Sequence, residues 1–255
     1  LNRFLKATKL TLQQLDNTNN GGMLDTCLII KSEEWAQSYQ GNKEIQFVYA
    51  PNIQKLTARQ FYGVSIQLFY APNLRIAGPW SLWSTLLTHV QFPLLESIEE
   101  RVFVFNQFKI INLSSLQKMN GLHNFYTCMN LHTLIAVNLE HIGNEPFKYN
   151  ANLHTVIIPK VDLIDNCFCG CSNLKAVLAL SSVFKCNCRK CPKCKGVFDS
   201  CLRQGSKFNL YQPMKLNKDI LSEKYGQLHK LKLKMQFKSS IVSNLYCMCR
   251  QVLST

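Results

Sequence analysis

Residues 153–171 read LHTVIIPKVDLIDNCFCGC, and the spacing of apolar residues in this stretch decides the fold. Counted from Leu153, apolar residues stand at offsets 3, 5, 8, 11 and 15, and a proline follows the second of them. Side chains alternate along a strand, so Val156 and Ile158 point to one face. Pro159 then ends the strand because it offers no backbone donor. One such unit cannot bury its own apolar residues, whereas stacked units share a continuous core.

The same spacing recurs along the chain. Units start at Ile45, Ile66, Leu87, Phe108, Leu131, Leu153 and Leu174. Successive starts are separated by 21, 21, 21, 23, 22 and 21 residues. Leu24, with Cys27 and Ile29, fits one step earlier, and the unit from Ile66 has Trp80 and Trp83 where the regular turn is expected. A β-sandwich also has regularly spaced strands, but it does not repeat a six-position signature, so the pattern favours a repeat solenoid.

This order of residues, clearest from Leu153 to Cys171, resembles the BspA-type leucine-rich repeats. The resemblance implies a curved horseshoe solenoid that serves in adhesion or protein binding, with no catalytic residues to carry over. It also implies a secreted or cell-surface protein. We therefore predict a mainly β, right-handed leucine-rich-repeat solenoid with units of about 21–23 residues.

Charge and cysteine content divide the chain into four parts. Up to Phe184, 14 Lys and Arg balance 12 Asp and Glu, but from Lys185 onward the count is 15 against 3. Ten of the twelve cysteines lie at or after Cys167. We expect an N-terminal flank or degenerate repeat (1–23), the solenoid (24–184), a Cys-rich segment or cap (185–201) and a basic C-terminal region (202–255). A further degenerate repeat is an alternative for this last region.

Two columns of side chains should face outward, at offsets 1 and 4 of each unit. Neighbouring strands lie about 4.8 Å apart, so each column forms a ladder of adjacent side chains. The candidate partner-binding residues on these columns are Tyr49, Tyr70, His132, His154, Ile135 and Ile157. Outward isoleucines mark either a partner site or contact with another part of the chain. The two histidines could bind metal or sense pH, but a solvated or partner-contacting pair is the simpler interpretation.

The cysteines fall into two kinds. Cys128 and Cys171 each follow a turn aromatic by three residues, which indicates small buried turn residues with no metal or redox role. The segment 186–194 instead holds overlapping C-x-x-C spacings that suit a tetrahedral Zn²⁺ site or disulfides. The candidate ligands are Cys186, Cys188, Cys191 and Cys194. Disulfides, zinc and free thiols all remain open, and zinc would favour a cytoplasmic location.

The basic C-terminal region alternates from residue 231 to 238, which predicts a half-buried strand with lysines on one face. These lysines are Lys230, Lys232, Lys234 and Lys238. They could bind a polyanion such as nucleic acid, acidic protein or anionic lipid, or simply protect an edge strand from aggregation. Nucleic acid is the weaker alternative, because no RNA-binding signature or recognition helix is present.

The sequence contains no motif of a known catalytic centre. G-x-S-x-G, the phosphate loop, G-x-G-x-x-G and H-E-x-x-H do not occur. No run of about 18 apolar residues occurs either, so we expect no membrane-spanning helix. The first residues lack the order of a signal peptide. The sequence predicts a non-catalytic protein-interaction or adhesion module, with a zinc-stabilised polyanion-binding module as the alternative. Partner, compartment and oligomeric state stay open.

Overall fold

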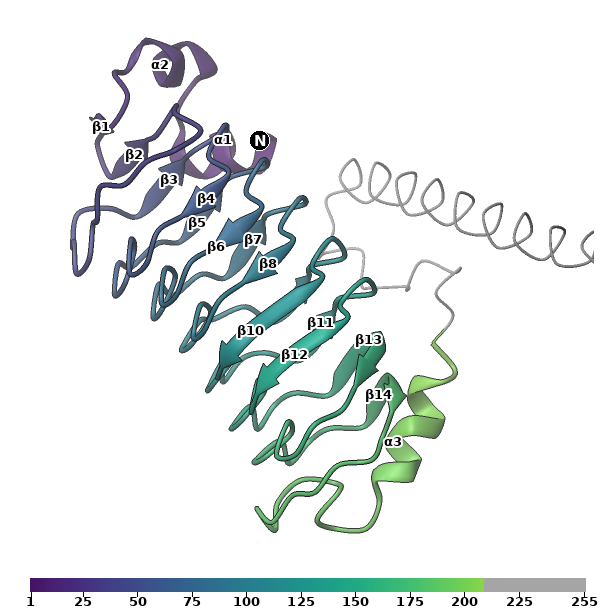
Figure 1. Cartoon of the computed structure of the whole chain (residues 1–255). Helices are drawn as coiled ribbons and strands as arrows, with labels where there is room; N and C mark the ends of the chain where they lie inside the picture. Colours follow the sequence, from purple (N-terminus) through teal and green to yellow (C-terminus); the bar gives the residue numbers. More distant parts are fainter. Residues whose placement is uncertain (209–255) are drawn as a thin grey trace, which may run out of the picture. The chain divides into compact units, whose positions relative to one another are not determined.

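A computed structural model of the chain describes residues 1–208 (Figure 1). The chain divides into two units, Leu1–Ser206 and Lys207–Thr255, and the account below concerns the first. The predicted lysine-faced strand and Lys230, Lys232, Lys234 and Lys238 lie outside the described residues. No helix within residues 1–208 is long and apolar enough to cross a membrane.

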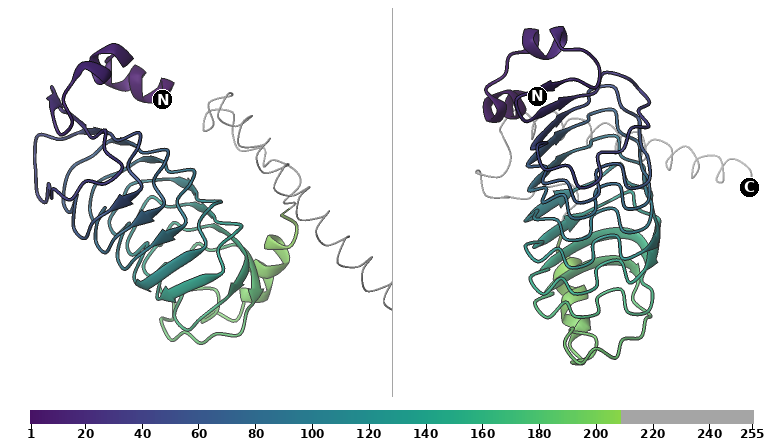
Figure 2. Two further views of the ribbon diagram at one scale, coloured as in Figure 1. Left: turned by 45° about the horizontal axis from the view of Figure 1, so that its top comes forward. Right: turned by 90° about the vertical axis from the view of Figure 1, so that its left-hand side faces the viewer.

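Each repeat supplies one strand to a row of parallel strands, and the apolar spacing sets their register. The first part of this row joins β2 (Cys27–Ile29), β3 (Phe47–Tyr49), β5 (Leu68–Tyr70) and β7 (His89–Gln91). The second joins β9 (Ile110–Asn112), β11 (Thr133–Ile135), β13 (Thr155–Asp162) and β14 (Ala176–Ser181). Leu134 pairs with Val156, and Val156 pairs with Val177, so equivalent positions of successive units lie side by side. Figure 2 shows the stacked turns from two further sides.

A second parallel sheet closes the other side of the coil. Its strands are β4 (Lys55–Leu56), β6 (Ile76–Ala77), β8 (Ser97–Ile98), β10 (Lys118–Leu122) and β12 (His141–Asn144). They form around the predicted apolar position at offset 11, for example Leu56 and Ile98, which are fully buried. The repeat solenoid predicted from the sequence is therefore confirmed. Five turns, those that start at Ile45, Ile66, Leu87, Phe108 and Leu131, each have two strands with the apolar core between them.

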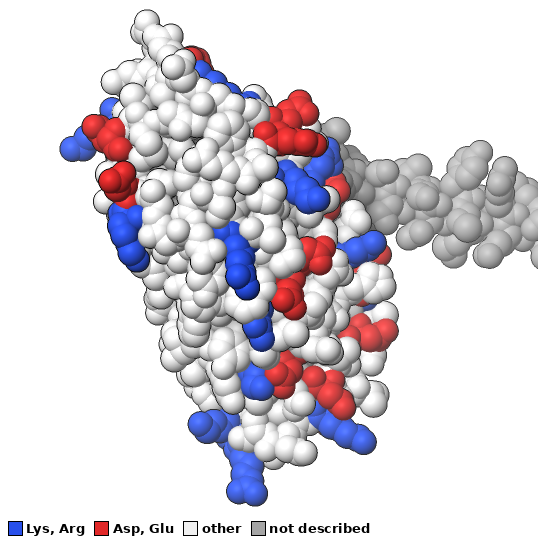
Figure 3. All heavy atoms as spheres, turned by 60° about the vertical axis from the view of Figure 1, so that its left-hand side comes forward, with Lys and Arg blue, Asp and Glu red and all other residues white. Residues whose placement is uncertain are grey.

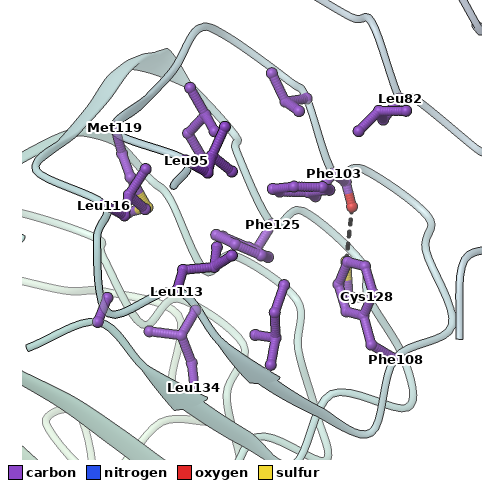
Figure 4. Close-up of a cluster of buried hydrophobic side chains, with 14 of the residues drawn as sticks. Leu82, Leu95, Phe103, Phe108, Leu113, Leu116, Met119, Phe125, Cys128 and Leu134 are labelled. Atoms are coloured by element: carbon purple, nitrogen blue, oxygen red, sulfur yellow. Dashed lines mark hydrogen bonds between the residues drawn. The ribbon is translucent and has the colours of Figure 1, made fainter. Parts of the chain in front are cut away.

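Aromatic side chains fill the turn that joins the second sheet to the next repeat. Phe103, Phe125, Phe147 and Phe168 are fully buried, and their ring centroids follow one another at 5.2, 6.0 and 5.6 Å. Figure 4 shows Phe103 and Phe125 among the buried side chains of Leu95, Leu113, Leu116 and Leu134. In the unit from Ile66, Leu82 takes the buried place of the phenylalanine.

Cysteine and asparagine occupy equivalent buried positions after these aromatics. Cys128 Sγ donates to the carbonyl oxygen of Phe103 at 2.9 Å (Figure 4). Cys171 Sγ donates in the same way to the carbonyl oxygen of Phe147, in the preceding turn, at 3.0 Å. Asn150 Nδ2 donates to the carbonyl oxygen of Phe125, also in the preceding turn, at 2.7 Å. The prediction that Cys128 and Cys171 are buried turn residues is confirmed, and their hydrogen bonds link consecutive turns.

Two short helices cover the N-terminal end of the strand row on its outer face. α1 (Asn2–Thr8) buries Phe4, and α2 (Leu12–Asn17) buries Leu15. α2 begins with a capping box, in which Thr11 and Gln14 bond each other's backbone N–H groups. β1 (Met23–Leu24) then forms an antiparallel hairpin with β2. The outer face of the first strands is therefore packed against the chain's own helices.

The position of the first repeat corrects the predicted alignment by one residue. Leu28, and not Cys27, pairs with Val48 of the next strand. Leu28 therefore joins the main core, whereas Cys27 and Ile29 pack under the N-terminal helices with Phe4. A one-residue shift moves every side chain of a strand to the opposite face. The inward role predicted for Cys27 and Ile29 was wrong because both faces of this strand are buried.

The helix α3 (Phe198–Gly205) lies at the C-terminal end, against β14 (Figure 1). Phe198 packs on Phe184 with ring centroids 5.0 Å apart and on Phe168 at 6.1 Å. Cys201 Sγ donates to the carbonyl oxygen of Leu174 at 3.3 Å. These contacts cover the last apolar face of the solenoid, as the end of a repeat array requires.

Candidate functional site

An open groove of about 650 Å³ crosses four successive repeats beside the second half of the strand row. Its walls are two rows of polar side chains, one residue before and one residue after the buried residue that starts each unit. The first row is Gln107, Asn130, Asn152 and Asn173, and the second is Lys109, His132, His154 and Lys175. None of these residues is acidic, so the groove presents hydrogen-bond donors and positive charge.

The two histidines form the centre of the groove. Their rings are stacked, with centroids 4.7 Å apart and planes 10° from parallel. In each ring Nδ1 lies 3.0 Å from the hydroxyl of the following threonine, Thr133 or Thr155. This contact holds each ring against the start of its strand, so the predicted adjacency of His132 and His154 is present. The Nε2 edges carry no protein hydrogen bond among the interactions of the described residues and remain available to a ligand.

Burial lowers the pKa of His132, and the positive charges of Lys109 and Lys175 lower it further. Burial also lowers the pKa of His154, with further contributions from His132 and Lys175. Both rings therefore favour the neutral form at neutral pH. Because the folded state disfavours protonation, the stability linked to these histidines is fully present above their ordinary pKa of 6.5 and is lost as the pH falls below it.

A proton NMR titration of the imidazoles tests this arrangement. We expect both histidines to titrate below pH 6.5, and we expect both pKa values to rise in Lys175→Gln, because one charge near both rings is removed. Lys118→Gln, which changes a lysine on the second sheet, should leave both values unchanged. Equal titration curves for wild type and Lys175→Gln would show that this lysine does not act on the pair.

The other predicted partner-binding residues are less accessible. Tyr49 stacks on Tyr70 at 5.5 Å, and Phe4 of α1 packs on both rings, at 5.7 and 6.0 Å. Burial raises the pKa of both tyrosines. Ile135 and Ile157 are 7% and 0% exposed. Of the six residues, only His132 and His154 line the groove.

The asparagine row was not found by sequence reasoning, although a signal exists. An Asn–Leu pair opens three consecutive units, at 130–131, 152–153 and 173–174. The leucine is buried in each case, and the asparagine before it is exposed. A search for repeated apolar residues uses only the leucine of each pair, so it does not detect the asparagine. Asn130 Nδ2 donates to Gln107 Oε1 at 2.7 Å, which links neighbouring members of the row.

A second surface feature that the sequence reasoning missed is a ladder of aromatic side chains at the outer edge of the turns. Tyr62 stacks on Trp83 at 4.4 Å, and contacts continue to Phe105, Tyr126 and Tyr149 at 5.4, 6.2 and 5.5 Å. The irregular Trp83 of the unit from Ile66 is thus one member of the ladder. Charges of both signs are interspersed over the face shown in Figure 3.

The four predicted ligand cysteines converge in the loop between β14 and α3. The Sγ atoms of Cys186, Cys188, Cys191 and Cys194 all lie within 4.8 Å of one another. Burial raises the pKa of Cys188, but hydrogen bonds from backbone N–H groups, including that of Gly170, outweigh this effect and lower its pKa to about 6. None of the ten cysteines among the described residues is joined in a disulfide.

A family model for the BspA type leucine rich repeat region matches residues 54–175 in six copies. Residues 54–175 carry BspA-type leucine-rich repeats. The match contains all the residues that line the groove, from Gln107 to Lys175, and it ends before the cysteine loop. The matched residues form a leucine-rich-repeat solenoid, a fold typical of protein-binding repeat domains. No curated protein and no solved structure matches the chain.

Proposed function

We propose that this BspA-type solenoid is a non-catalytic recognition module that binds an extended acidic segment of a partner protein in the groove of four repeats. The observation that carries the proposal is the composition of the groove, where two lysines and two stacked histidines stand opposite a row of amides with no carboxylate. Lysines and protonated histidines attract carboxylates, and amide side chains can pair with a peptide backbone. Adhesion is the same activity when the partner lies on a cell surface.

Several features support an extended ligand. The groove follows the repeat axis, so each unit presents one amide and one basic side chain. The spacing of parallel strands, about 4.8 Å, places these groups at regular intervals along the groove. The regular rows favour recognition over catalysis, because no nucleophile is paired with a base among the lining residues.

The alternative, a zinc-stabilised polyanion-binding module acting through Lys230, Lys232, Lys234 and Lys238, rests on lysines outside the described residues. Tyr49, Tyr70, Ile135 and Ile157 are secondary contact candidates, since their burial leaves little area to a partner.

Charge reversal in the groove should abolish recognition. Peptides would be selected from a random displayed library on the immobilised full chain and then measured by fluorescence anisotropy. We expect the selected peptides to be rich in Asp and Glu. We expect Lys109→Glu/Lys175→Glu to weaken the binding of these peptides at least about tenfold, because attraction becomes repulsion at both ends of the groove. Binding should tighten as the pH falls through the histidine titration, since the rings then gain charge.

A matched control is Lys55→Glu/Lys118→Glu, which makes the same charge change on the second sheet. Its affinity for the selected peptides should stay within about twofold of the wild-type value, apart from a general charge effect that salt screens. Selected peptides without acidic residues, or peptides that bind the groove variant as tightly as wild type, would refute this function.

A further inference from the structure

The loop from 185 to 197 holds four thiols together at the C-terminal end of the solenoid. The Sγ atoms of Cys188 and Cys194 lie 3.7 Å apart, and those of Cys191 and Cys194 lie 3.6 Å apart. Zinc bonds to thiolates at about 2.3 Å, so sulfurs at the corners of a tetrahedron around one ion lie about 3.8 Å apart. The observed sulfur separations therefore match a single four-sulfur site.

Backbone groups already orient the cluster. Cys188 Sγ accepts hydrogen bonds from the N–H groups of Gly170, Cys191 and Lys190, at 3.3, 3.4 and 3.5 Å. Such bonds to the ligand atoms fix their direction in metal sites. Gly170 can approach because it has no side chain, since a Cβ there would lie 2.5 Å from the ring of Tyr149. The last turn of the repeats thus supports the cysteine loop directly.

The charge around the cluster suits a metal thiolate centre. One divalent ion and four thiolates have a net negative charge, which nearby cations stabilise. Residues 185–195 contain no acidic residue and five basic ones. These are Lys185, Arg189, Lys190, Lys193 and Lys195.

Both ends of the loop are anchored in the core. Phe184 precedes it and Phe198 follows it, and the two rings pack 5.0 Å apart in the main hydrophobic cluster. Lys193 Nζ lies 5.0 Å from the centroid of the Phe184 ring. Between these anchors the loop has few apolar side chains, and its four cysteine sulfurs lie together at its centre. An ion bound there would fix α3 over the last repeat.

We propose that Cys186, Cys188, Cys191 and Cys194 bind one Zn²⁺ ion, which closes the C-terminal cap of the solenoid. Four thiolates select soft or borderline ions, and a closed four-ligand site is structural because it leaves no position for a substrate. The ion contributes directly to the folding free energy of the cap. The site is independent of the groove, so either proposal can fail without the other.

The test uses the full chain, reduced and dialysed against zinc, with metal content measured by plasma mass spectrometry. We expect one zinc per chain in wild type and at least a tenfold loss of zinc affinity in Cys191→Ser. Cys169→Ser is the matched control, because Cys169 is a half-exposed neighbour of the cluster but not one of its four members. It should keep its zinc. A chelator should lower the melting temperature of wild type and of Cys169→Ser, but not that of Cys191→Ser.

Cobalt substitution of the wild-type chain does not depend on the folding of any variant. We expect the sulfur-to-cobalt charge-transfer bands and the strong visible bands of tetrahedral Co²⁺ with four thiolates. A reduced wild-type chain that takes up neither metal would overturn the proposal, as would iron in place of zinc. It would also be overturned by equal zinc loss from Cys169→Ser and Cys191→Ser, or by an intact mass that shows these four cysteines joined in disulfides.

Discussion

Replacement of Phe125 by alanine is expected to lower the free energy of unfolding by about 3–5 kcal/mol. The Phe125 ring is fully buried between turns, with the rings of Phe103, Phe108 and Phe147 at 5.2, 6.2 and 6.0 Å. Its removal leaves a cavity that short, hydrogen-bonded turns cannot close. In a solenoid each repeat is stabilised by its neighbours, so one cavity weakens two interfaces.

Urea unfolding followed by circular dichroism measures this loss. The matched control is Phe105→Ala, because Phe105 is a phenylalanine of the outer aromatic ladder with 37% of its surface exposed. We expect a loss below about 1 kcal/mol there, since an exposed ring leaves no cavity. A loss below about 1.5 kcal/mol for Phe125→Ala would mean that the aromatic turns do not form the continuous core.

The apolar spacing was sufficient to predict the solenoid because each offset has one structural role. The positions of Val48, Phe69, Ile111 and Leu134 are buried and in parallel register, although the unit lengths vary. Part of the extra length is taken up by a register shift in β10, between Met119 and Leu122, which leaves these buried positions aligned. The first repeat was misplaced because Cys27, Leu28, Ile29 and Ile30 are all buried, so no alternation marks the inward face.

The candidate site was only partly predictable for a related reason. Column positions placed His132 and His154 together, because neighbouring strands repeat the same geometry. The same rule placed Tyr49 and Tyr70 outward but could not show that α1 packs on them, since that contact joins parts far apart in sequence. The cysteine spacing indicated the four ligands, whereas their support by Gly170 depends on how the loop folds back on the last turn.

Replacement of Asn106 by alanine is expected to lower the free energy of unfolding by about 2–4 kcal/mol, because it leaves buried backbone groups without partners. Asn106 is fully buried, and its Oδ1 accepts from Leu87 N–H at 2.9 Å and from the Thr85 hydroxyl at 2.8 Å. Its Nδ2 donates to the Leu82 carbonyl at 2.8 Å. This side chain therefore joins two turns.

The same urea titration, applied to an exposed asparagine, tests whether the stability loss is specific to the buried Asn106. Asn130 is exposed and makes one side-chain bond, to Gln107, so Asn130→Ala should change stability by less than about 0.5 kcal/mol. Loss of the Leu87 N–H acceptor should also speed amide exchange at Leu87 in Asn106→Ala. Unchanged exchange there, with a stability loss under about 1 kcal/mol, would mean that other groups satisfy the freed N–H. The turns would then be held together by apolar packing and by the backbone hydrogen bonds of the parallel strands, because the side-chain bonds of Asn106 would add nothing to them.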